Sequence, residues 1–159
     1  MTERIYTVLL ALLVGSQAAV GYLVAPTVFE VIADRGVAGT IAGAIFERTG
    51  WMSLAILIVL LILRWRLHQT QILPSRFPSL ILITMLGLTA LGHFMIRPWI
   101  GHIRFMIQQS GGFEMCEPAM RNQFGMLHGI SSILFLLVFL LGLSLLWRLK
   151  ESLGQSKSA

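Results

Sequence analysis

Charged residues are scarce in this sequence of 159 residues, and their scarcity excludes an ordinary soluble domain. Asp, Glu, Lys and Arg make up 12% of the chain, about half of the ~25% that is usual for soluble domains. Hydrophobic residues make up 56%, and the mean hydropathy is +0.81. This composition is typical of an integral membrane protein.

Cysteine is nearly absent, and the common nucleotide-binding motifs are missing. The one cysteine, Cys116, excludes an intramolecular disulfide and every Cys-x-x-Cys site. The sequence has no Walker A motif and no Gly-x-Gly-x-x-Gly, which argues against the usual nucleotide folds. The net charge is +5, but the basic residues are dispersed and mostly flank apolar segments. This pattern favours membrane anchoring over nucleic-acid binding.

Four apolar stretches approach or exceed the ~20 residues that cross a bilayer as a helix. We therefore predict an all-α fold, a single integral membrane domain that is a four-helix bundle. The expected spans are about 5–29, 44–64, 79–97 and 124–147, followed by a short polar tail at 151–159. Arg97-Pro98 is expected to end the third span. The sequence leaves open whether residues 37–46 continue the second helix or lie at the membrane surface.

The basic residues also predict an orientation. More of them fall on the side of the N-terminus than on the opposite side, which predicts that both termini are cytoplasmic (N-in, C-in) in an inner or plasma membrane. A cleaved secretory signal is the alternative interpretation of the first span. It is disfavoured because the residues before Ile5 carry no net positive charge and the apolar run continues well past Ala18.

Small residues recur at the four-residue spacing that lets membrane helices approach closely. The pairs are Gly21 with Ala25, Gly39 with Gly43, and Gly125 with Gly129. They favour packing within the bundle, with a homo-oligomer or another membrane protein as the alternative partner beside the lipid bilayer. Pro26 lacks a backbone N–H, which frees a backbone carbonyl near Tyr22 and predicts a kink in the first helix.

Two histidines are candidate ligands for a cofactor. His93 lies near the end of the predicted third span and His128 near the start of the fourth, so we expect both to face the bundle interior at one depth. Imidazoles in this arrangement could bind the iron of haem b or a copper ion, and the sulfurs of Met95 and Met126 would suit copper. The alternative is that each histidine only contacts a neighbouring backbone carbonyl.

Three segments resemble a known family. Residues 21–29 contain Ala-Pro-x-x-Phe, residues 38–46 contain Ala-Gly-x-x-x-Gly-x-x-Phe, and residues 124–132 contain Phe-x-x-x-His-x-x-Ser. In this order the segments resemble the transmembrane-protein-205-like family of small four-helix membrane proteins, a domain of unknown function. A looser similarity links that family to copper-resistance D-type membrane proteins and to a haem-binding protoporphyrinogen oxidase group. The resemblance implicates His128 and His93.

No catalytic constellation is evident in the sequence, because no carboxylate is placed to orient His128 beside Ser131 and Ser132. We therefore expect a non-enzymatic membrane protein that is transport-associated, structural or partner-binding. The alternative is a membrane redox protein that binds haem b or copper through His93 and His128.

Overall fold

The computed structural model describes residues 2–69, 77–113 and 115–155 of the protein, and in these residues it contains helices and turns but no strand. The all-α prediction is therefore confirmed. The elements in chain order are α1 (Thr2–Ala19), η1 (Val20–Val24), α2 (Ala25–Val31), α3 (Arg35–Gln69), α4 (Phe77–Leu91), η2 (Gly92–Ile96), α5 (Arg97–Gln109) and α6 (Pro118–Gln155).

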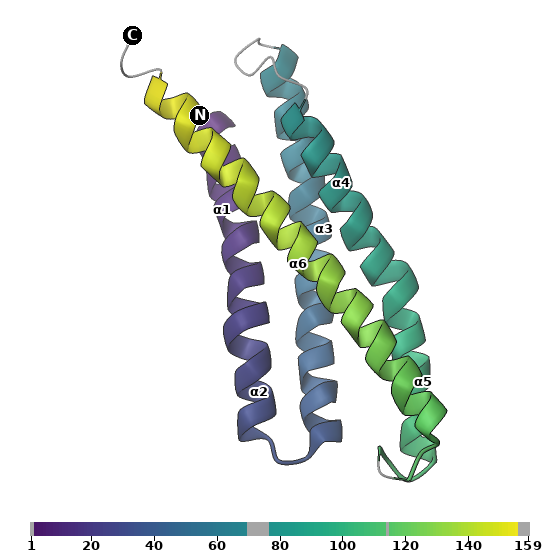
Figure 1. Ribbon diagram of the computed structural model, residues 1–159. Coiled ribbons are helices and arrows are strands. Elements are labelled where there is room, and N and C mark those ends of the chain that lie inside the picture. The colour runs from purple at the N-terminus through teal and green to yellow at the C-terminus, as the bar shows by residue number, and fades with distance from the viewer. Residues whose placement is uncertain (1, 70–76, 114, 156–159) are drawn as a thin grey trace.

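These elements form four rods that run up and down in a bundle (Figure 1). Within the described residues, four helical stretches are long and apolar enough to cross a membrane: Thr2–Val31, Arg35–Leu67, Phe77–Gln109 and Pro118–Leu149. A multi-pass membrane protein with a four-helix bundle is thus confirmed, while the orientation and the particular membrane stay predictions. We call the end of the bundle that holds both chain termini the terminal end, and the opposite end the turn end (Figure 1).

The four rods do not contact each other equally along their length. The rod of α1 packs against α3 and α6, and α4 packs against the same two helices. Toward the turn end, α6 crosses the bundle diagonally and lies on α5, while α2 lies beside α3 (Figure 1). The bundle therefore consists of two hairpins, residues 2–69 and 77–155, that are closely joined at the terminal end.

Both hairpins begin with a rod that contains a π-turn followed by a proline. In η1 the Ala25 N–H donates to Val20 O, and in η2 the Arg97 N–H donates to Gly92 O. Pro26 and Pro98 then lie near the start of the next α-helical segment, where the missing N–H is tolerated. The prediction that Arg97-Pro98 ends the third helix is therefore wrong, because the π-turn adjusts the backbone and the helix continues to Gln109.

The second and fourth rods are uninterrupted. Asp34 caps α3, since its Oδ1 accepts hydrogen bonds from the N–H groups of Gly36 and Val37 at 2.7 and 3.1 Å. Residues 37–46 thus continue the second helix, which answers the question left open by the sequence. The segment predicted as a polar tail begins as helix through Gln155, and residues 156–159 lie outside the described residues.

The turn between α5 and α6 requires glycine. Gly111 and Gly112 have φ angles of 93° and 104°, a region that residues with a Cβ rarely adopt. The Gly112 N–H donates to Ile107 O at 2.9 Å, which satisfies a carbonyl in the last turn of α5. This turn reverses the chain so that α6 returns along α5.

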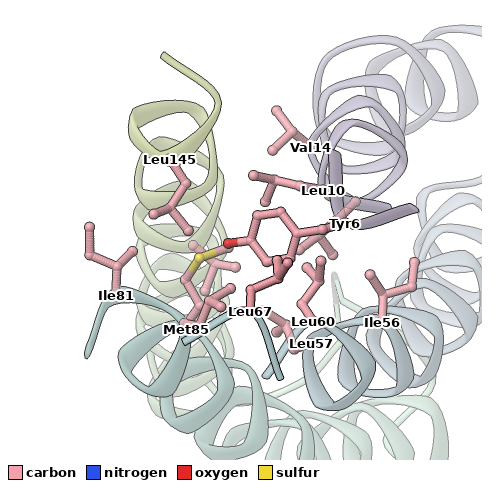
Figure 2. Packing of buried hydrophobic residues seen from close by; sticks show 13 residues of the cluster. Tyr6, Leu10, Val14, Ile56, Leu57, Leu60, Leu67, Ile81, Met85 and Leu145 are labelled. Atoms are coloured by element: carbon pink, nitrogen blue, oxygen red, sulfur yellow. The ribbon is translucent and has the colours of Figure 1, made fainter. Parts of the chain in front are cut away.

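The larger of two apolar clusters lies at the terminal end. Figure 2 shows side chains of α1, α3, α4 and α6 meeting around Tyr6. Leu10, Leu13, Leu57 and Leu82 are fully buried in this cluster. In a membrane such helices associate through close side-chain packing, because lipid is as apolar as leucine. This cluster joins the two hairpins, while the smaller cluster of Ile103, Ile107, Cys116 and Leu127 packs α5 against α6 at the turn end.

Candidate functional site

Arg97 joins α5 to α3 at the turn end. Its Nη2 donates to Gly43 O at 2.9 Å and to Glu47 Oε2 at 3.0 Å. Glu47 lies one turn after Gly43 on α3, so the two acceptors share a face of that helix. These two hydrogen bonds hold the Arg97 guanidinium against α3.

Arg104 lies on the same side of α5, two turns after Arg97. Its guanidinium covers both glycines of the α3 pair, since a Cβ built on Gly43 would lie 2.9 Å from Nη1 and a Cβ on Gly39 would lie 3.6 Å from Nη2. Its Cζ is 5.8 Å from the centre of the Phe124 ring on α6. Arg104 therefore lies in the angle between α3 and α6 and contacts a π-face there.

The charges of this group are not balanced. Among the residues that the structure describes, the one ion pair joins Arg97 to Glu47, and Arg104 has no carboxylate partner. The two guanidinium groups are close enough to repel each other electrostatically. In addition, Arg97 Nη1 is buried and has no hydrogen-bond partner in the described chain. We call Gly39, Gly43, Glu47, Arg97 and Arg104 together the arginine site.

His93 lies one turn before Arg97 and packs on α3. Its ring centre is 4.5 Å from that of Trp51 and 5.1 Å from that of Phe94, both in edge contact. A Cβ built on Gly50 would lie 2.6 Å from His93 Nδ1, so the absence of a side chain at Gly50 admits the imidazole. His93 is half-buried between two helices, as expected for a side chain facing the interior.

His128 has a different environment. Its ring stacks on Phe124 of the same helix, with centres 6.1 Å apart and planes at 7°, and the residue is exposed. The expectation that both histidines face the interior therefore fails for His128. The ring contacts of the two imidazoles are with different aromatic residues, Trp51 of α3 and Phe94 of η2 for His93, and Phe124 of α6 for His128. A shared haem or copper role for them stays a prediction.

The two methionines proposed as copper ligands, Met95 and Met126, are exposed. The one cysteine, Cys116, is buried, with its sulfur 3.4 Å from Phe113 O. Over the described ranges, no three His, Cys, Asp or Glu side chains form a group that could hold a metal ion. Copper ligation by the two methionines also stays a prediction.

Some of the glycines predicted to pack between helices are in contact with another helix, and others are not. Gly39 and Gly43 are covered by Arg104, and a Cβ on Gly21 would lie 2.8 Å from the Phe135 ring. Ala25 and Pro26 follow η1 in the first rod. By contrast, a Cβ on Gly125 or Gly129 would meet no atom within 4 Å outside its own helix segment. The glycine pair of α6 thus faces open space within this chain, while the pair of α3 makes room for an arginine.

The arginine site was not predicted from the sequence. The predicted third span ends at residue 97, which leaves Arg104 in the interval before the fourth span. The signal that could have found the site is the seven-residue interval between the two arginines, which places both on one helix face if the helix continues.

The comparisons with known proteins give a family but no activity. A family described as a domain of unknown function (DUF4149) matches residues 8–109, which is more than half of the chain and includes Glu47, Arg97 and Arg104. No curated protein and no solved structure matches the chain.

Proposed function

Because the chain belongs to the DUF4149 family, whose function is unknown, we propose from its geometry a non-enzymatic membrane protein that binds an anionic ligand at the arginine site. The observation that carries the proposal is the excess of cations there. Two guanidinium groups meet at Gly43, and the one carboxylate of the site is paired with Arg97. Ionisable side chains within membrane spans are costly and usually have a function.

Phosphate-type groups are the ligands that best suit this site. The planar guanidinium presents N–H groups in a fork that matches the oxygens of a phosphate or carboxylate. Arg97 Nη1 is buried without a partner, and Arg104 has its N–H groups free of any described hydrogen-bond acceptor. The shared chemistry is a phosphate-type oxyanion, supplied either by an anionic lipid headgroup or by a free anion from the water phase.

This proposal is a finer form of the transport-associated or partner-binding role expected from the sequence. Binding of an anion at one end of a membrane bundle is the first step that a transport-associated factor needs. The finer resemblance to transmembrane-protein-205-like and copper-resistance D-type proteins stays a prediction and carries no activity of its own. Homo-oligomers and protein partners likewise stay predictions.

The test measures two probes on the purified protein in neutral detergent. Phosphatidylglycerol is compared with phosphatidylcholine by native mass spectrometry, and inorganic sulfate is titrated by calorimetry. Arg104→Gln should weaken binding of the effective probe about tenfold, since a hydrogen bond to a charged group contributes roughly 1.5 kcal/mol. Arg121→Gln is the matched control, because it removes one exposed positive charge from α6 at the same end of the bundle.

The two probes distinguish the source of the anion. Preference for phosphatidylglycerol without sulfate binding indicates a lipid headgroup, and sulfate binding indicates a free anion. If Arg104→Gln and Arg121→Gln lose affinity equally, binding depends only on the general surface charge, and the arginine site is refuted. Absence of binding by both probes would refute it as well.

A further inference from the structure

The two π-turns make matching contacts with the opposite hairpin. The second residue of η1 is Gly21, which meets Phe135 of α6, and the second residue of η2 is His93, which meets Gly50 of α3. At each crossing a glycine contacts a flat ring. At the first crossing the glycine belongs to the π-turn, and at the second the ring belongs to the π-turn. At the first crossing the ring is a phenyl group, and at the second it is an imidazole.

Comparison of the two crossings shows whether the contact with Gly50 needs the nitrogens of His93 or only a ring of that shape. At the equivalent crossing a phenyl ring packs closely on a glycine, since a Cβ on Gly21 would lie 2.8 Å from Phe135 Cε1. The nitrogens of His93 are therefore unnecessary for packing against Gly50. In the described part of the chain, the side chain of His93 makes ring contacts but no hydrogen bond. Its nitrogens are therefore available to a hydrogen-bond partner from outside the chain.

Arg97 is the residue of the arginine site that lies next to His93 along this rod. It follows His93 by one turn, and the two side chains pack along one face of α3, at Gly50 and at Glu47 with Gly43. His93 lies close enough to Arg97 and Glu47 to interact electrostatically with both. Arg97 Nη1 is a buried donor without a partner in the described chain, and the imidazole carries an N–H as well. Arg97 and His93 thus offer two neighbouring donors to one external acceptor group.

We infer that His93 is a third ligand-binding residue of the arginine site, and that its imidazole N–H donates to an oxyanion that also contacts Arg97. The inference rests on the proposed function and makes it more specific. The ligand has at least two acceptor oxygens, one for Arg97 and one for His93, as a sulfate, a phosphate or the phosphodiester of a lipid headgroup has.

The experiment uses His93→Phe, the ring that the equivalent crossing already contains, so the variant should fold. Binding of sulfate and of phosphatidylglycerol is measured on the full chain at pH 8. We expect His93→Phe to weaken the effective probe about tenfold. His93→Gln, which restores an N–H donor, should bind within about threefold of wild type. His128→Phe is the control and should leave the affinity unchanged.

The outcomes separate this inference from the proposed function. If His93→Phe binds both probes as wild type does while Arg104→Gln does not, His93 is a packing residue and the inference is overturned, but the arginine site stands. The inference is overturned in the same way if His93→Gln binds as poorly as His93→Phe. If wild type binds neither probe, both proposals fall.

Discussion

At the terminal end of the bundle, leucines from all four spans fill the space between the helices, whereas at the turn end the glycines of α3 face two arginines of α5. The first kind of contact is mainly apolar packing, although Arg64 is also buried at this end. The second depends on hydrogen bonds and charge, and it leaves a buried donor of Arg97 without a partner in the described chain. We therefore expect stability to depend mainly on the terminal end and the proposed ligand to bind at the turn end.

The largest expected effect is at the terminal end. Leu57 is fully buried, so Leu57→Ala should lower the free energy of unfolding by about 1–3 kcal/mol, because the cavity remains while transfer to lipid adds little. The measurement is unfolding in mixed micelles with increasing sodium dodecyl sulfate. Ile58→Ala is the control, since its side chain points outward and is 50% exposed. Equal losses in the two variants would contradict a packed core at this end.

A pair of glycine substitutions compares the two ends directly. A Cβ on Gly142 would lie 2.7 Å from Val14 Cγ2 and 3.2 Å from Met85 Cε, so Gly142→Ala should cost about 1–2 kcal/mol. A Cβ on Gly129 would meet open space, and Gly129→Ala should stabilise the helix by roughly 0.5 kcal/mol. The same unfolding assay measures both. A loss at Gly129 comparable to that at Gly142 would show that α6 has a partner at the turn end.

Removal of the Glu47 carboxylate, which pairs with Arg97, should increase the net positive charge of the arginine site. Glu47→Gln leaves both guanidinium groups uncompensated, so the affinity for sulfate or phosphatidylglycerol should rise about fivefold. The free energy of unfolding should change by less than about 1 kcal/mol, because the Glu47 side chain is 55% exposed and such ion pairs are weak. Glu30→Gln, on α2 at the same end, is the matched control. Weaker binding in Glu47→Gln would mean that Glu47 positions Arg97 for the ligand.

The smallest expected effect concerns the start of α3. Asp34→Ala removes the acceptor of two backbone N–H groups and should cost roughly 0.5–1 kcal/mol in the unfolding assay. Asp34→Asn keeps a capping oxygen and should retain most of the stability. A loss as large as that of Leu57→Ala would show that the turn end contributes more to the fold than its packing indicates.

Much of the architecture was predictable because it depends on local composition. A helix in lipid must satisfy its own backbone hydrogen bonds, so a long apolar run with few charges can form little else. For this reason the four spans and the all-α fold follow from the residues themselves. The small spacing of Gly39 and Gly43 also indicated a close approach to α3, although it did not indicate which residue makes that approach.

The continuation of the third helix could not be predicted from its proline. A proline normally ends a helix, yet η2 supplies a π-turn before Pro98 and the helix runs on to Gln109. That continuation places Arg104 against α3 instead of in a loop. Because a proline is expected to end a helix, the sequence alone does not predict that Arg97 and Arg104 lie on one continuous helix, and it does not predict the arginine site.

The sequence by itself determined four membrane-crossing helices, because hydrophobicity acts over each segment independently of the others. Only the tertiary structure decided that Arg97 and Arg104 meet at Gly43, that His93 packs on Gly50, and that His128 stays exposed. These outcomes depend on which helix faces surround each other and on the rotation of each helix about its axis. That rotation is set by side-chain packing between segments far apart in the chain, such as Gly21 against Phe135, and no local pattern specifies it.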